Sequence, residues 1–233
     1  MRERLLWLFT SEEGLAWRIA GGVAVFAALA VWDVCRNGRA ARRWKEYVFL
    51  LTAVATACAY GIVNDQLTVR ISWEYYVYGK ELMQYLAPDG AVNHAGLRAE
   101  AVGVGAAATW WCGLLFGAAI LLVNNPRPHR PAVSFARLYA MLPVVLAAAA
   151  VLAAVGGVLG WSGRLAWAFP EGVPDEWRPH RLMCVWGMHL GGYLGGVLGT
   201  VLACGHVLHR RATSVRHFLV ARRNHSVYSD LSR

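Results

Sequence analysis

The sequence predicts an all-α integral membrane protein, with about five transmembrane helices in one bundle and an interfacial segment on the outer side. Hydrophobic residues make up 57% of the 233-residue chain and charged residues only 16%, which is outside the usual balance of soluble proteins. The formal charge of +9 comes from short clusters of Lys and Arg between long apolar runs. Membrane orientation explains this arrangement better than nucleic-acid binding does.

Five apolar stretches reach or approach the roughly 20 residues that a helix needs to cross a bilayer core. The N-terminal segment before them has the basic start of a signal peptide but lacks a credible cleavage site, so we expect it to stay at the interface. Segments 64–100 and 161–181 are expected to cap one mouth of the bundle, and 209–233 to form a basic tail. The predicted spans are 15–34, 47–63, 101–123, 139–160 and 182–208.

The distribution of basic residues predicts the orientation. Segments 35–46 and 124–138 and the tail after 208 hold most of the 23 Lys and Arg residues. The positive-inside rule therefore places the N-terminus outside and the C-terminus in the cytoplasm. In the alternative interpretation the N-terminal segment is cytoplasmic and the first span is re-entrant, because Arg18 and Asp33 interrupt its ends.

Four glycines of the fifth span recur every four residues and form a narrow ridge along one helix face. Lipid provides no hydrophobic drive between helices, so small residues that let backbones approach closely indicate a helix contact. The partner is either another helix of this chain or a second protein, as in a homo-oligomer or a complex with a membrane partner subunit. The ridge consists of Gly187, Gly191, Gly195 and Gly199.

The segment 60–80, just after the second span, alternates polar groups with large aromatic rings. We expect 68–72 to be extended and 74–86 to form an interfacial helix that lies over the bundle mouth. The carboxylates of this segment would then converge near the membrane surface. Its candidate ligand-binding residues are Asn64, Asp65, Gln66 and Glu74.

The fifth span adds two more candidate ligand-binding residues. His189 and Tyr193 are four residues apart and therefore share a helix face. His189 lies eight residues beyond Arg181, which corresponds to a depth of about 12 Å at the helical rise per residue. An ionisable side chain at that depth is costly, so it is a functional-site candidate by default.

One hypothesis is that Asp65, Glu74 and His189 bind a divalent metal, because carboxylate and imidazole together suit Zn, Fe or Mn. The sequence has no HExxH, HxxxH or paired ExxH motif to specify such a site. The other interpretation is a structural hydrogen-bond network that joins the segment to the fifth span. Neither interpretation assigns a catalytic residue.

Several short segments resemble an uncharacterised family of bacterial multi-pass integral membrane proteins: YGIVNDQ, EYY and YGK within 60–80, WRIAGG near the first span, and GMHLGGYLGG in the fifth. This chain departs from the family pattern at Trp73 and Tyr76, where Pro and Phe are expected. The resemblance implies the bacterial inner membrane and no particular function.

The leading functional interpretation is an outer-side polar pocket that binds a small ligand, lipid or metal, and whether the protein is an enzyme stays open. The first alternative is a non-catalytic assembly subunit that packs through the glycine ridge. The second is a small-solute or proton transporter, although the middles of the first four spans contain almost no ionisable side chains.

Overall fold

The computed structural model describes residues 12–127, 131–168 and 174–231, and these residues confirm the all-α fold class. No strand occurs among them. Within the described ranges, five helices are long and apolar enough to cross a membrane. The long helices are α2 (Glu12–Asn37), α3 (Arg43–Ile71), α5 (His94–Asn124), α7 (Leu142–Trp161) and α8 (Pro179–Leu231); the short ones are α4 (Trp73–Val77), α6 (Phe135–Tyr139), η1 (Gly38–Ala40), η2 (Met83–Tyr85), η3 (Ala166–Ala168) and η4 (Asp175–Trp177).

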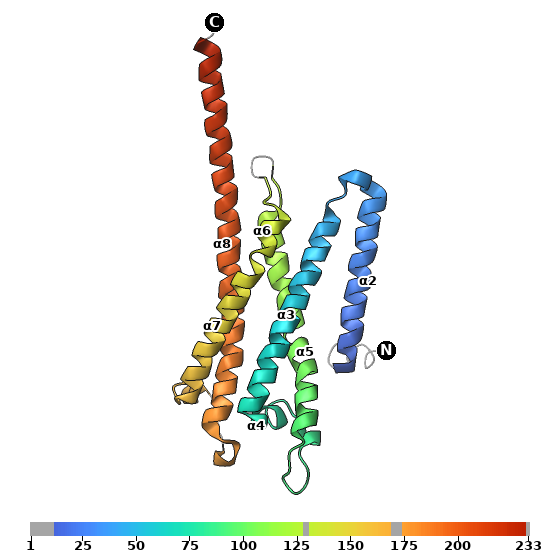
Figure 1. The fold of residues 1–233 in the computed structure, drawn as a ribbon, viewed down its shortest axis with the longest axis vertical. Helices are drawn as coiled ribbons and strands as arrows, with labels where there is room; N and C mark the ends of the chain where they lie inside the picture. The colour runs from blue at the N-terminus through green and yellow to red at the C-terminus, as the bar shows by residue number, and fades with distance from the viewer. Residues whose placement is uncertain (1–11, 128–130, 169–173, 232–233) are drawn as a thin grey trace.

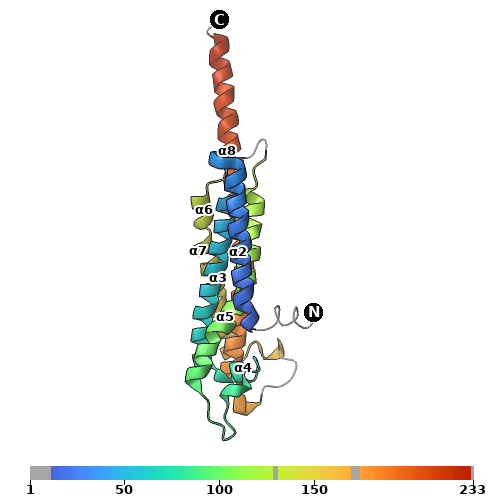
Figure 2. The same cartoon turned by 90° about the vertical axis from the view of Figure 1, so that its right-hand side faces the viewer.

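The long helices run up and down in alternation, so that each is antiparallel to the next along the chain (Figure 1). The start of α2 lies toward the same end of the bundle as α4, whereas α8 extends well beyond the other helices at the opposite end (Figures 1 and 2). Helix α2 stands at the edge of the bundle, and many of its large apolar side chains are exposed on the surface. Such side chains are suited to contact with lipid tails.

Helix α3 is longer than the sequence predicts, since it continues past residue 63 to Ile71. The expectation of an extended chain at 68–72 is therefore wrong for all but the last of these residues. Thr68 shows the reason: its hydroxyl donates to the carbonyl oxygen of Asn64 at 2.9 Å, and the side chain is fully buried. Contacts with the rest of the fold accommodate polar residues here that hydropathy alone assigns to a loop.

The expected interfacial helix over 74–86 is also replaced by shorter elements. Helix α4 begins after Ser72, whose hydroxyl oxygen accepts a hydrogen bond from the backbone N–H of Tyr75 at 3.3 Å. It ends at Val77, and the chain then turns through Glu81, which has a positive φ of 59°. A continuous helix cannot pass through such a residue.

The glycine ridge of α8 lies against α7 of the same chain, and its four members are buried. A Cβ added at Gly187 would collide with the backbone carbonyl of Gly156 on α7, and one added at Gly191 would collide with that of Leu152. One added at Gly199 would come within 2.8 Å of the Cα of Val145. The ridge therefore allows two backbones to touch inside this bundle rather than forming an exposed face.

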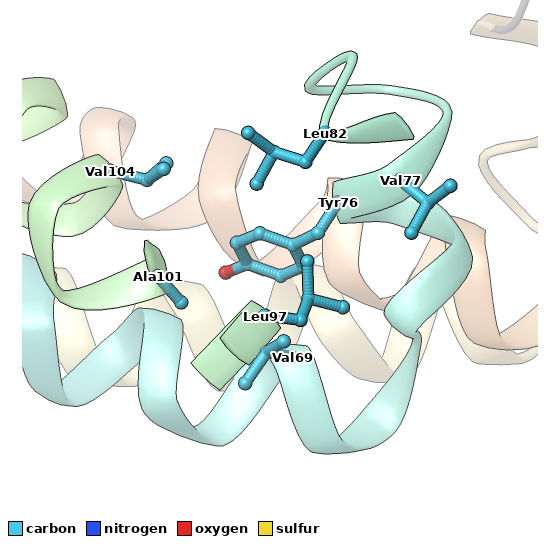
Figure 3. Packing of buried hydrophobic residues seen from close by; sticks show 7 residues of the cluster. All are labelled: Val69, Tyr76, Val77, Leu82, Leu97, Ala101 and Val104. Atoms are coloured by element: carbon cyan, nitrogen blue, oxygen red, sulfur yellow. The ribbon is translucent and has the colours of Figure 1, made fainter. Parts of the chain in front are cut away.

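At the end of the bundle that carries α4, buried apolar side chains from three helices surround the ring of Tyr76 (Figure 3). This cluster fastens the short helix onto α3 and α5. Tyr76 is completely buried, and it is the largest fully buried side chain of the cluster. The cluster consists of Val69, Tyr76, Val77, Leu82, Leu97, Ala101 and Val104.

Buried charges at the opposite end have backbone partners. Asp33 accepts hydrogen bonds from the backbone N–H groups of Arg43 at 2.8 Å and Trp44 at 3.3 Å, and it thereby caps the start of α3. The guanidinium of Arg211 donates to carbonyl oxygens of the α5–α6 connection, including Asn125 at 2.7 Å and Pro131 at 3.2 Å. Both side chains thus hold connections in place.

Candidate binding site near α4

A polar cluster joins α3 to α8 near the end that carries α4. Nδ1 of His189 lies 3.5 Å from Nδ2 of Asn64 and 3.8 Å from Oδ1 of Asp65. The Asn64 amide also donates to Oδ1 of Asp65 at 3.4 Å. Asp65 is only 2% exposed, so its carboxyl group is almost completely buried inside the bundle. Asn64 and Asp65 reach His189 of α8 because α3 continues as a helix through these two residues.

Helix α4 covers this cluster with aromatic rings. The ring of Tyr75 stacks on that of His189, with centroids 5.0 Å apart and planes at 13°. The hydroxyl of Tyr76 pairs with that of Thr68 at 2.7 Å and donates to the carbonyl oxygen of Asp65 at 3.3 Å. Burial, reinforced by the nearby carboxyl of Asp65, raises the pKa of both tyrosines above that of an ordinary phenol. Both hydroxyls therefore stay protonated and available as donors.

Glu74 holds α4 against the segment that precedes α8. Its Oε2 accepts a hydrogen bond from the hydroxyl of Ser72 at 2.8 Å, and its Oε1 lies 3.7 Å from Nε of Arg178. Next to this ion pair, the rings of Tyr78 and Trp177 stack with centroids 4.5 Å apart. Glu74 therefore helps to attach α4 to the rest of the bundle, and it does not line the space beneath α4.

Beneath the polar cluster a narrow cleft of about 80 Å³ runs between α3, α5, α7 and α8. On α3 it extends from Asp65 to Ala53, and these 12 intervals correspond to about 18 Å of helix. Most of its wall is apolar, with polar groups at the end near α4. The lining residues that matter for the chemistry are Tyr60, Asn64, Asp65, Phe116, His189 and Tyr193.

Three buried polar atoms in the lining have no hydrogen-bond partner: the hydroxyl of Tyr60, Oδ2 of Asp65 and Nε2 of His189. A buried polar group without a partner costs about 1–3 kcal/mol. Gly192 leaves room for the Tyr60 hydroxyl, because a Cβ there would come within 2.9 Å of that oxygen. These three atoms are the part of the site that can bind a polar group of a ligand.

The structure brings together four of the residues that the sequence singles out, namely Asn64, Asp65, His189 and Tyr193. Tyr193 is 38% exposed, and its hydroxyl donates to the carbonyl oxygen of Ala108 at 3.2 Å. Gln66 lies elsewhere, since its amide donates to the carbonyl oxygen of Arg98 at 2.7 Å.

The hypothetical metal ligands are not assembled into a set. Among the residues that the structure describes, no group of three His, Cys, Asp or Glu side chains is placed to hold a metal ion. Asp65 and His189 are neighbours, but Glu74 is engaged with Ser72 and Arg178. A divalent metal at this site therefore stays a prediction.

Sequence reasoning missed Tyr60. It lies four residues before Asn64 and thus on the same helix face, but the predicted end of the span at residue 63 separated the two. A helix extended by two turns would have placed Tyr60, Asn64 and Asp65 together. The boundary was misplaced because the polar residues after 63 lower the local hydropathy.

The fold and the site define a helical membrane protein with an apolar cleft that ends at a buried polar cluster. No family model, curated protein or solved structure matches the chain. The resemblance to an uncharacterised bacterial family therefore stays a prediction.

Proposed function

We propose that this protein binds a small amphipathic molecule in the cleft, with the polar group of the ligand at Asp65, His189 and Tyr60. The observation that carries the proposal is the position of three unpartnered polar atoms at one end of an otherwise apolar space. Pockets with an apolar lining and a few convergent polar groups are typical ligand sites. The small volume of the cleft, about 80 Å³ along several turns of α3, suits a slender apolar group such as an alkyl chain.

The two rival functions have less support. Assembly through the glycine ridge would need an accessible ridge, whereas α7 of the same chain occupies it. Transport would need charged or polar groups along a path to the other end, but Asp33 and Arg211 serve there to hold backbone connections. Our proposal retains the inner membrane of a bacterium as the location, with the α4 end on the outer side.

Filling the cleft is expected to abolish binding without unfolding the bundle. Ala57 lines the cleft, so the larger side chain of Ala57→Leu would occupy the space of the ligand. The probe is a long-chain alcohol with a photoreactive diazirine in its chain, added to the full-length protein in lipid nanodiscs. We expect labelled peptides from the cleft walls, and a loss of labelling in the variant of at least about tenfold, equivalent to about 1.4 kcal/mol.

Ala55→Leu is the matched control, because Ala55 is exposed on the same helix two residues away. It should leave labelling of the cleft unchanged, and both variants should unfold at the temperature of the parent protein. Equal labelling of the parent protein and of Ala57→Leu would overturn the proposed function, as would labelling spread evenly over the lipid-facing residues.

A further inference from the structure

The charge around the cleft selects among the polar groups that a ligand can carry. Of the described residues that line it, Asp65 is the one carboxylate, and none is Lys or Arg. Two cations near the site lie outside this lining: Arg178 pairs with Glu74, and the exposed Lys80 lies over the ring of Tyr75 at 5.7 Å, from where its charge still acts on Asp65. A phosphate or carboxylate would therefore bring a second negative charge next to Asp65 in a cleft whose described lining has no Lys or Arg, which is unfavourable in an apolar surrounding.

The three unpartnered atoms of the cleft favour a ligand group that donates hydrogen bonds. Oδ2 of Asp65 and the hydroxyl oxygen of Tyr60 both carry lone pairs. Nε2 of His189 also accepts when the ring proton is on Nδ1, the nitrogen that lies 3.8 Å from Oδ1 of Asp65 and 3.5 Å from Nδ2 of Asn64. A primary ammonium has three donors and no acceptor, which matches three such atoms.

Aromatic rings around the same space add to this preference. Tyr60, Phe116 and Tyr193 line the cleft, and the ring of Tyr75 closes over His189. The faces of such rings attract cations, and they do so more strongly when water is excluded. The apolar wall then contacts the remainder of the molecule.

We propose that the ligand of the cleft is an organic cation, an alkylammonium whose charged nitrogen binds against Asp65. This inference rests on the proposed function and specifies the chemical class of the ligand. The carboxylate provides the charge complement, Tyr60 and His189 accept the remaining hydrogen bonds, and the apolar substituent lies along α3 toward Ala53. Hydrogen bonds between charged partners are about twice as strong as neutral ones.

Competition among three molecules of equal chain length tests this inference. An alkylammonium, the corresponding alcohol and the corresponding carboxylate are each titrated against a fixed amount of the photoreactive alcohol, with concentrations compared within the nanodisc membrane. We expect the ammonium to suppress cleft labelling at a concentration at least about tenfold lower than the alcohol, and the carboxylate to be the weakest of the three.

Asp65→Asn keeps the size of the side chain and removes its charge, so the advantage of the ammonium over the alcohol should disappear. Competition in Asp65→Asn is scored relative to the labelling that the photoreactive alcohol gives in the same variant, and Ala55→Leu, at an exposed position of α3, is the control that should keep both the labelling and the preference for the ammonium. Equal competition by ammonium and alcohol in the parent protein, or an unchanged preference in Asp65→Asn, would overturn the inference.

If Asp65→Asn loses labelling altogether, Asp65→Glu decides: the charge preference must return with the carboxylate, and its absence counts against the inference. Failure of the proposed function itself gives a different result, namely no cleft labelling in the parent protein.

Discussion

Gly191→Leu is expected to lower the free energy of unfolding by about 3 kcal/mol, the upper end of the range for overpacked cores. The side chain would enter the contact between α8 and the backbone carbonyl of Leu152 on α7, where no flexible group can move aside. The two helices would have to separate, and the dispersion contacts between their backbones would be lost. Equilibrium unfolding in mixed micelles, followed by tryptophan fluorescence, measures this change.

Gly205→Leu is the matched control for the ridge. Gly205 lies on the same helix, but a Cβ added there has no heavy atom within 4 Å. We expect its free energy of unfolding to stay within about 0.5 kcal/mol of the parent value, as for most surface substitutions. Equal destabilisation by the two leucines would mean that the contact between α7 and α8 is not close in the membrane.

Tyr76→Ala is expected to destabilise the protein by about 3–5 kcal/mol, the usual loss when a large buried aromatic side chain is truncated. The ring is the centre of the cluster that fastens α4 (Figure 3). Its hydroxyl bonds to Thr68 and to the backbone of Asp65. Its removal should also release α4, so that backbone amides of 73–77 exchange with solvent much faster. Equilibrium unfolding and hydrogen exchange followed by mass spectrometry measure the two effects.

Tyr76→Phe distinguishes the contribution of the ring to stability from that of the hydroxyl. It keeps the apolar contacts and loses the hydrogen bonds, so we expect a smaller destabilisation of about 1–3 kcal/mol, the range for leaving a buried partner unsatisfied. Slow exchange at 73–77 in Tyr76→Ala would show that other contacts hold α4 over His189, and it would contradict the role of this cluster.

The number and type of the long helices could be predicted from the sequence because apolar runs of sufficient length have few other structures open to them. The ends of these helices could not be predicted, because hydropathy does not show which polar residues are buried or hydrogen-bonded in the fold. Thr68 bonds to its own helix, and Asp65 is buried beneath α4. These contacts allow α3 to continue where composition alone predicts a loop.

The candidate site was predictable in part for a related reason. Asp65 and His189 are recognisable as ionisable groups beside or within apolar segments. Tyr193 follows from its spacing to His189, and Asn64 from the polar composition of the segment 60–80. Glu74 has the same chemical type, but its partner Arg178 lies far away in the sequence, so its role in attaching α4 is visible only in the fold. The spacing of the glycines likewise predicts a helix contact without naming α7 as the partner.

The most direct test of the central claim is an experimental structure in lipid nanodiscs with the photoreactive alcohol present before illumination. We predict elongated density between α3, α5, α7 and α8, with its polar end at a hydrogen-bond distance of about 3 Å from Oδ2 of Asp65 and Nε2 of His189. Density confined to the outer, lipid-facing surface would contradict it. So would a closed cleft in which these two atoms bond to groups of the protein itself.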